Sequence, residues 1–208
     1  MSRLVNNLIK DGYLRTDAII DAFSEIQRIE FIPEELESEA EANIPLPIGF
    51  GQTISQPLTV AIMFELLNPE VGHHVLEVGS GSGWATALLS YIVGSKGKVT
   101  SLEIIPELYA IGKTNVDKYG YVKNGIADMQ CSDGTHGYPP NAPYDRILVS
   151  AMATEVPQAL KDQLKVGGKM VIPIHNDIWY LEKRGDNDFY KEEYPGFSFV
   201  PLVQQGKV

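Results

Sequence analysis

The sequence predicts an α/β fold in which helices cover both faces of a mostly parallel, doubly wound sheet, with a helical extension at the N-terminus. Three observations predict it. From residue 75 onward short β-branched runs alternate with helical apolar patterns, a glycine-rich turn follows the first run, and an acidic residue ends the second. Alternating strands and helices bury a parallel sheet between two helical layers with right-handed crossovers.

The expected strands and helices alternate along the chain. Apolar positions at helical spacing mark a helix face after the glycine turn: Ala85, Leu88, Leu89 and Ile92. Further helices are expected from Pro106 and after Val156. Strands are expected at residues 75–78, 98–102, 127–131, 146–150, 170–174 and 178–182. Residues 197–202 are expected to form one more strand, running antiparallel.

The N-terminal region reads as helical and then strongly acidic. Ile19, Phe23 and Ile26 repeat at helical spacing after a possible cap at Thr16. The dense glutamates of residues 34–41 repel one another, so they are expected on a solvated helix face or loop. We expect one domain over residues 1–208, with helices and a loop in 1–70 and the α/β core in 71–208.

Charge and composition exclude several classes of function. The 208 residues include 17 Lys and Arg against 27 Asp and Glu, a net charge of −10, which disfavours nucleic-acid binding. The chain shows neither a secretory signal nor the ~18 uninterrupted apolar residues of a membrane span, so a cytoplasmic protein that does not enter the membrane is expected, and we expect a monomer. The single Cys131 cannot close an intrachain disulfide. No metal is expected, because the histidines lack a metal-ligand spacing: His73, His74, His136 and His175.

A glycine-rich turn, residues 77–83 (EVGSGSG), lies where a strand ends and a helix begins. Glycine allows backbone angles that a Cβ forbids and lets a ligand approach the main chain. Glu103 ends the next strand, 20 residues after Gly83, where a carboxylate can accept the hydroxyls of a ribose. The two features together indicate a cofactor that carries a nucleoside.

Two alternatives to this interpretation stay open at the level of the turn. The dinucleotide fingerprint is G-x-G-x-x-G, whereas this turn is G-x-G-x-G, and a glycine turn can also serve no ligand at all. Asp133 and Gly134 follow the strand at 127–131. A carboxylate there could accept the adenine amine, although an Asp-Gly turn without a ligand is equally natural.

An apolar loop precedes the core. Residues 44–57 contain three prolines, two glycines and no charge, and an apolar helical stretch follows them. Ser55, two residues before Pro57, can cap that helix, with proline in the first turn. Its hydroxyl can also be directed into the cofactor crevice, and the two roles can coexist.

The motifs resemble those of known enzymes. The glycine turn resembles that of class I S-adenosylmethionine-dependent methyltransferases, which have a Rossmann-like fold. Residues 45–57 (PLPIGFGQTISQP) resemble the signature loop of the protein-L-isoaspartate (D-aspartate) O-methyltransferase family. The resemblance extends over nearly the whole chain, through residues 31–33 (FIP), 76–83, 133–134, 142–145 (APYD), 163–168 and 199–202 (FVPL).

The resemblance implies transfer of a methyl group from S-adenosyl-L-methionine to the free α-carboxylate of L-isoaspartyl or D-aspartyl residues, which begins the repair of damaged proteins and leaves S-adenosyl-L-homocysteine. The implied partners are damaged proteins and peptides. Ser55 carries over as the active-site residue. The implied cofactor-side positions are Gln52, Thr53, Ile54, Ser55, Glu77, Gly79, Ser80, Gly81, Glu103, Ile104, Asp133 and Gly134.

The chemistry of this reaction needs no general base, because a carboxylate with a pKa near 4 is already ionised at neutral pH. Ser55 is then expected to orient the carboxylate by a charge-assisted hydrogen bond. Glu41, Asn43 and Leu58 depart from residues frequent in the family, which keeps open a cofactor-binding protein with weakened turnover. The other alternative is a dinucleotide-dependent oxidoreductase.

Overall fold

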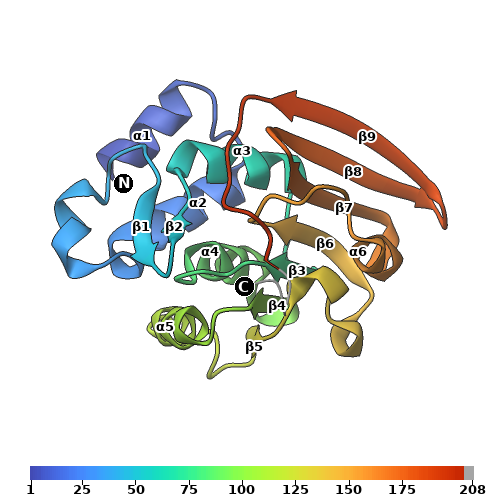
Figure 1. Cartoon of the computed structure of the whole chain (residues 1–208). Helices are drawn as coiled ribbons and strands as arrows, with labels where there is room; N and C mark the ends of the chain where they lie inside the picture. Colours follow the sequence, from blue (N-terminus) through green and yellow to red (C-terminus); the bar gives the residue numbers. More distant parts are fainter. Residues whose placement is uncertain (204–208) are drawn as a thin grey trace.

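A seven-stranded sheet forms the centre of the molecule (Figure 1). The computed structural model describes residues 1–203, and residues 204–208 lie outside the described part. The strand order is β5-β4-β3-β6-β7-β8-β9. Five strands run parallel: β3 (His74–Val78), β4 (Lys98–Glu103), β5 (Ala127–Cys131), β6 (Tyr144–Val149) and β7 (Leu164–Ile174). Two antiparallel strands complete one side: β8 (Asp177–Gly185) and β9 (Asp188–Pro195).

Helices cover both faces of the sheet, which confirms the predicted α/β layering. One hydrophobic cluster contains side chains of α1 (Arg3–Lys10), α2 (Asp17–Glu25), α3 (Pro57–Leu67), α4 (Trp84–Val93) and α5 (Pro106–Asp117). The other includes Leu160 of α6 (Gln158–Gln163). Successive strand residues point to opposite faces, so Val75 of β3 belongs to the first cluster and Leu76 to the second.

The N-terminal helices pack directly on the helices of the core. Phe23 of α2 makes edge-to-face contacts with Phe64 of α3 and with Trp84 of α4, at centroid distances of 6.1 and 5.5 Å. Thr16 is the N-cap residue of α2, as expected, but its hydroxyl does not cap the helix. It donates instead to the Glu65 carboxylate of α3, at 2.8 Å, and so ties the two regions together.

Most predicted elements are present, with extended boundaries and three additions. β7 begins six residues before the expected position 170, and β9 was not predicted. The apolar loop contains a short hairpin of β1 (Leu46–Gly49) and β2 (Gln52–Ile54). The acidic run forms a short 3₁₀ helix, η2 (Glu34–Glu39), and all five of its glutamates from 34 to 41 are exposed, as expected. The remaining 3₁₀ segments are η1 (Arg28–Phe31), η3 (Gly94–Lys96), η4 (Gly134–His136) and η5 (Pro139–Asn141).

The prediction of an antiparallel strand at residues 197–202 is wrong. The chain leaves the sheet at Gly196, whose φ of 97° favours glycine, and then crosses the carboxyl ends of the parallel strands (Figure 1). There it makes only an isolated parallel bridge between Met152 and Pro201. β9 occupies the position beside β8 at which the tail was expected to pair. The tail therefore passes over the carboxyl ends of the parallel strands instead.

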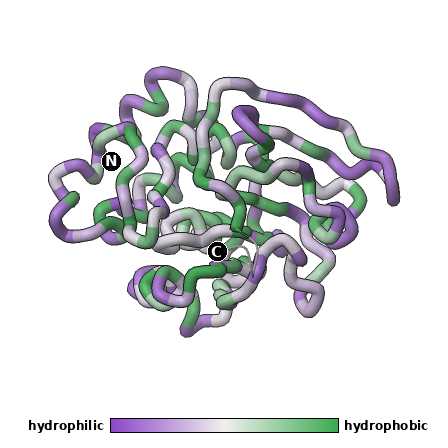
Figure 2. Tube along the Cα trace, viewed as in Figure 1, coloured by the Kyte–Doolittle hydropathy of each residue, from purple (hydrophilic) through white to green (hydrophobic). Residues whose placement is uncertain are grey.

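Hydrophobic residues follow the central strands, whereas hydrophilic residues gather at the tip of the β8–β9 hairpin (Figure 2). Between residues 1 and 203, no helix is both long enough and apolar enough to cross a bilayer. The same residues contain no group of three or more His, Cys, Asp or Glu side chains arranged to hold a metal ion.

Candidate active site

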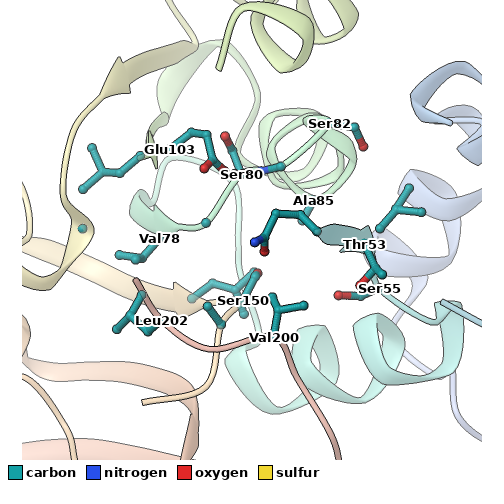
Figure 3. A pocket seen from close by; sticks show the side chains of 18 of the residues that line it. Thr53, Ser55, Val78, Ser80, Ser82, Ala85, Glu103, Ser150, Val200 and Leu202 are labelled. Carbon is teal, nitrogen blue, oxygen red and sulfur yellow. Dashed lines mark hydrogen bonds between the residues drawn. The ribbon is translucent and has the colours of Figure 1, made fainter. Parts of the chain in front are cut away.

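A cavity lies at the carboxyl ends of the parallel strands. Such a position is where open α/β sheets bind their ligands. Figure 3 shows Thr53 and Ser55 on one side of the cavity and Ser80 and Glu103 on the other. The tail residues 200–203 form part of a third side.

The structure brings ten of the twelve predicted site residues into the lining of this cavity. They are Gln52, Thr53, Ile54, Ser55, Gly79, Ser80, Gly81, Glu103, Ile104 and Gly134. They come from four places in the sequence, because β2, the glycine turn, the end of β4 and the segment after β5 all meet at one edge. Glu77 and Asp133 are the two that lie outside the lining.

The glycine turn and Glu103 form one rigid unit. The Glu103 carboxylate accepts hydrogen bonds from the Gly81 N–H at 2.8 Å and from the Ile105 N–H at 3.0 Å, and its residue is only 6% exposed. Gly83, with φ +94°, is the N-cap residue of α4, and a Cβ there would lie 2.8 Å from the Gly112 carbonyl oxygen of α5. Glycine is thus required both by the left-handed backbone and by the close approach of α5. The carboxylate can accept further hydrogen bonds, and Glu103 lines the cavity.

Glu77 is buried behind the turn. Its side chain is fully buried and accepts hydrogen bonds from the hydroxyls of Thr86 in α4 and Ser101 in β4. One carboxyl oxygen, Oε1, has no partner among residues 1–203. Burial raises the pKa of the Glu77 carboxyl to about 7. This residue therefore links the sheet to α4 behind the glycine turn. Side chains alternate along β3, so Glu77 points to the same face as Val75, which is the face that α4 covers.

Asp133 caps a short helix in the segment after β5. Its carboxylate accepts hydrogen bonds from the N–H and the hydroxyl of Thr135, at 2.9 and 2.7 Å, as the N-cap residue of η4. The neighbouring Ser132 and Gly134 line the cavity. The Asp-Gly pair thus shapes the cavity wall through its backbone and its cap.

The loop wall presents Ser55 to the cavity. The expected cap of α3 by Ser55 is wrong: the Asn43 side-chain oxygen accepts the hydrogen bond from the Leu58 N–H, at 2.9 Å, and the N-cap position is Gln56. An acceptor 15 residues away replaces the local one because the hairpin carries Asn43 back to the helix start. Figure 3 shows the Ser55 oxygen turned into the cavity, and within the described chain no hydrogen bond of this hydroxyl is found.

Several lining residues were not predicted. Ser132 and Ser150 follow the ends of β5 and β6, and their place directly after parallel strands is the signal that points to the cavity. The tail residues Val200 to Val203 also line the cavity, although the motif at residues 199–202 predicts a strand and no site residue. Their place in the lining depends on the path of the tail over the sheet edge, which local sequence does not fix.

The cavity wall fits a ligand that is part apolar and part hydrogen-bonding. The hydroxyl oxygens of Ser80 and Ser132 are buried and have no partner among the residues described. Both residues line the cavity. Because a buried polar atom without a partner is costly, each of these two hydroxyls would gain stability from a hydrogen bond to a bound molecule that reaches it. The apolar side chains of Val78, Leu102 and Ile105 complete a surface suited to a flat heterocycle and a sugar.

A parallel sheet with this glycine turn and this cavity defines a Rossmann-like methyltransferase of class I. Solved structures agree. A structure of a protein-L-isoaspartate O-methyltransferase superposes with a TM-score of 0.88 at 31% identity; the match covers 97% of this chain and 65% of that one. A protein of this kind from Plasmodium falciparum, solved with S-adenosyl-L-homocysteine, has the same fold, with a TM-score of 0.85, 24% identity and coverage of 96% of each chain.

Sequence comparison gives the family. The model of the family protein-L-isoaspartate(D-aspartate) O-methyltransferase (PCMT) matches residues 1–207. The protein-L-isoaspartate O-methyltransferase of Methanopyrus kandleri is 47% identical over 205 residues, covering 97% of this chain and 90% of its own. The chain belongs to the protein-L-isoaspartate(D-aspartate) O-methyltransferase family, which confirms the resemblance inferred from its motifs.

Proposed function

We propose that this protein transfers a methyl group from S-adenosyl-L-methionine to the free α-carboxylate of L-isoaspartyl residues in damaged proteins and peptides. Family membership over nearly the whole chain supports the reaction. One observation in the structure carries it: the Ser55 hydroxyl has no hydrogen-bond partner among residues 1–203 and faces the glycine turn and Glu103 across a single cavity. The Ser55 hydroxyl and the proposed nucleoside site at Glu103 thus lie in the lining of the same cavity.

The cofactor side of the cavity is the wall made by the glycine turn after β3 and by Glu103 at the end of β4, here called the sheet-edge wall. S-adenosyl-L-methionine supplies the methyl group and, on losing it, becomes the thioether S-adenosyl-L-homocysteine. The Glu103 carboxylate, already fixed by two backbone N–H groups, is placed to accept ribose hydroxyls. The free hydroxyls of Ser80 and Ser132 supply further hydrogen bonds, and Gly79 and Gly81 keep the main chain accessible.

The substrate side is the wall made by the loop. The Ser55 hydroxyl donates a hydrogen bond to one oxygen of the substrate carboxylate and leaves the other oxygen to attack. The attacking oxygen forms a bond to the methyl carbon while the carbon–sulfur bond breaks, so no proton moves and no base is needed. Ile48, Val200 and Leu202 line the same cavity and exclude water that would solvate the two charges.

The setting of the enzyme follows from its charge and packing. A net charge of −10 supports a protein that binds no nucleic acid, and we assign it to the cytoplasm as a monomer. Residues 1–208 act as one methyltransferase domain, because side chains of the N-terminal helices and of the sheet share one hydrophobic cluster.

A labelling assay tests the function. The protein is incubated with methyl-labelled S-adenosyl-L-methionine and a matched pair of peptides, one isoaspartyl and one with the normal aspartyl linkage. We expect base-labile label only on the isoaspartyl peptide. Equal label on both peptides, or none, contradicts the proposal. Cofactor binding without label indicates a binding protein with weakened turnover, and nicotinamide binding with fluorescence quenching indicates an oxidoreductase.

A further inference from the structure

A buried arginine holds the loop that carries Ser55. Arg28 begins η1 and is 5% exposed. Its guanidinium donates hydrogen bonds to four main-chain carbonyls of the loop region: Ala40 at 3.2 Å, Ala42 at 3.2 Å, Ile44 at 2.8 Å and Ser55 at 3.2 Å. One side chain thus gathers both ends of the β1–β2 hairpin.

The charge of Arg28 has no anionic partner in the described residues. No carboxylate oxygen of residues 1–203 lies within 4.0 Å of its nitrogens, and Nε lacks any hydrogen-bond partner. Burial lowers the pKa of Arg28 to about 10, which still leaves the side chain protonated at neutral pH. Carbonyl dipoles satisfy the N–H groups, yet they do not cancel the net charge.

This charge lies directly behind the cavity wall. The guanidinium carbon is 5.6 Å from the centroid of the Trp84 ring, and one terminal nitrogen is 3.2 Å from the Ser55 carbonyl oxygen. Both Trp84 and Ser55 line the cavity. Because protein surroundings screen a charge much less than water does, a cation at this depth favours an anion at the Ser55 hydroxyl over a neutral group of the same shape.

We propose that Arg28 is a positioning residue that fixes Ser55 through the loop carbonyls and, by its charge, makes the site select a carboxylate over a neutral amide. The inference rests on the proposed function. It also explains how a protein with a net charge of −10 can bind an anionic group, since the long-range field repels that group and a short-range cation must offset the repulsion.

The test compares binding of two peptides that differ by one charge. One is an isoaspartyl peptide, and in the other the free α-carboxylate is a primary amide. Affinities are measured by fluorescence anisotropy with S-adenosyl-L-homocysteine present, because this product lacks the sulfonium charge. We expect the native protein to prefer the carboxylate at least about tenfold, Arg28→Gln to prefer it less than about threefold, and Arg28→Lys to keep most of the preference.

Arg146 provides a matched control. It is also buried, at 8% exposure, and also donates to main-chain carbonyls, those of Asn68 and Asp145. It lies near the N-terminal end of β6, whereas the cavity lies at the carboxyl ends of the strands. Arg146→Gln is expected to lower the melting temperature while leaving the preference for the carboxylate unchanged.

The outcomes separate the hypotheses. A native protein that binds neither peptide argues against the proposed function itself. An Arg28→Gln variant that loses affinity for both peptides equally, or that keeps the native preference, overturns the role of Arg28 alone. If Arg28→Gln does not fold, Arg28→Lys provides the test. The proposal requires that its kcat falls at least about fivefold and that it still prefers the carboxylate peptide. A native kcat, or loss of that preference, contradicts the proposal.

Discussion

The two principal walls of the cavity are built differently. In the sheet-edge wall, the Glu103 carboxylate accepts hydrogen bonds from the N–H groups of Gly81 and Ile105, which lie in the turns after β3 and β4. In the loop wall, Arg28 donates to the Ser55 carbonyl, and Asn43 accepts from the Leu58 N–H at the start of α3. The sheet-edge wall is fixed by main-chain N–H groups in the turns that follow β3 and β4, whereas the loop wall is fixed by side chains that lie outside the β1–β2 hairpin.

This difference predicts which wall can be altered by substitution while the structure of the other wall is kept. Substitutions at the sheet edge act on a unit that is packed between α4, α5 and the sheet, so they affect folding or cofactor binding. Substitutions that free the loop leave the sheet-edge unit intact, so they affect the substrate step. Four substitutions test this division.

Glu77 tests whether the buried side of the sheet-edge wall is structural. Its raised pKa means that, between pH 4.5 and 7, the folded protein binds a proton that the unfolded chain releases. Stability from this group is present below pH 4.5 and is lost as pH rises to about 7, with a total of about 3 kcal/mol. In Glu77→Gln, the fall in the free energy of unfolding from pH 5 to pH 8 should be smaller by about this amount, measured by urea denaturation. Glu35→Gln, on the exposed acidic run, should behave like the native protein.

Glu103 tests the cofactor side of the same wall. Glu103→Ala removes the acceptor of two backbone N–H groups and the expected partner of the ribose. We expect the affinity for S-adenosyl-L-homocysteine to fall roughly 100-fold, measured by calorimetry. The exposed Glu107→Ala is the control and should bind normally. An unchanged affinity in Glu103→Ala would remove Glu103 from the cofactor site.

Ser55 tests the loop wall. Ser55→Ala removes the free hydroxyl that is expected to orient the carboxylate, and kcat on an isoaspartyl peptide should fall roughly 30-fold. The affinity for S-adenosyl-L-homocysteine should change less than about twofold, because the fixed contacts of the sheet-edge wall remain. Ser38→Ala, on the exposed η2, should leave both quantities unchanged. Near-native turnover in Ser55→Ala would falsify the role assigned to this hydroxyl.

Asn43 gives the smallest effect and tests what anchors the loop. Asn43→Ala removes the side-chain oxygen that caps α3 at the Leu58 N–H. The expected cost is about 1 kcal/mol in the free energy of unfolding, while Asn43→Asp keeps an acceptor and should lose much less. Chemical denaturation of the three proteins at one pH measures both. Equal stability of the Ala and Asp variants would show that the cap contributes nothing.

The predictions from sequence succeeded where a structural signal is local. The strands at 75–78 and 127–131, the helix opening at Pro106 and the place of the glycine turn all follow from short patterns and are confirmed. They failed where distant residues compete for the same position. β9 takes the place that was expected for the tail, and Asn43 takes the capping role that was expected for Ser55.

The sequence by itself determined the class of fold and the location of the cofactor turn, because periodicity and glycine spacing record backbone geometry directly, and the resemblance of its motifs indicated the family. Only the tertiary structure decided that Glu77 is buried behind the turn while Glu103 lines the cavity, and that the tail forms one of its sides. It also placed the buried charge of Arg28 beside the Ser55 carbonyl. The reason is physical: which face a side chain points to, and which backbone group it meets, depends on how elements distant in sequence pack together.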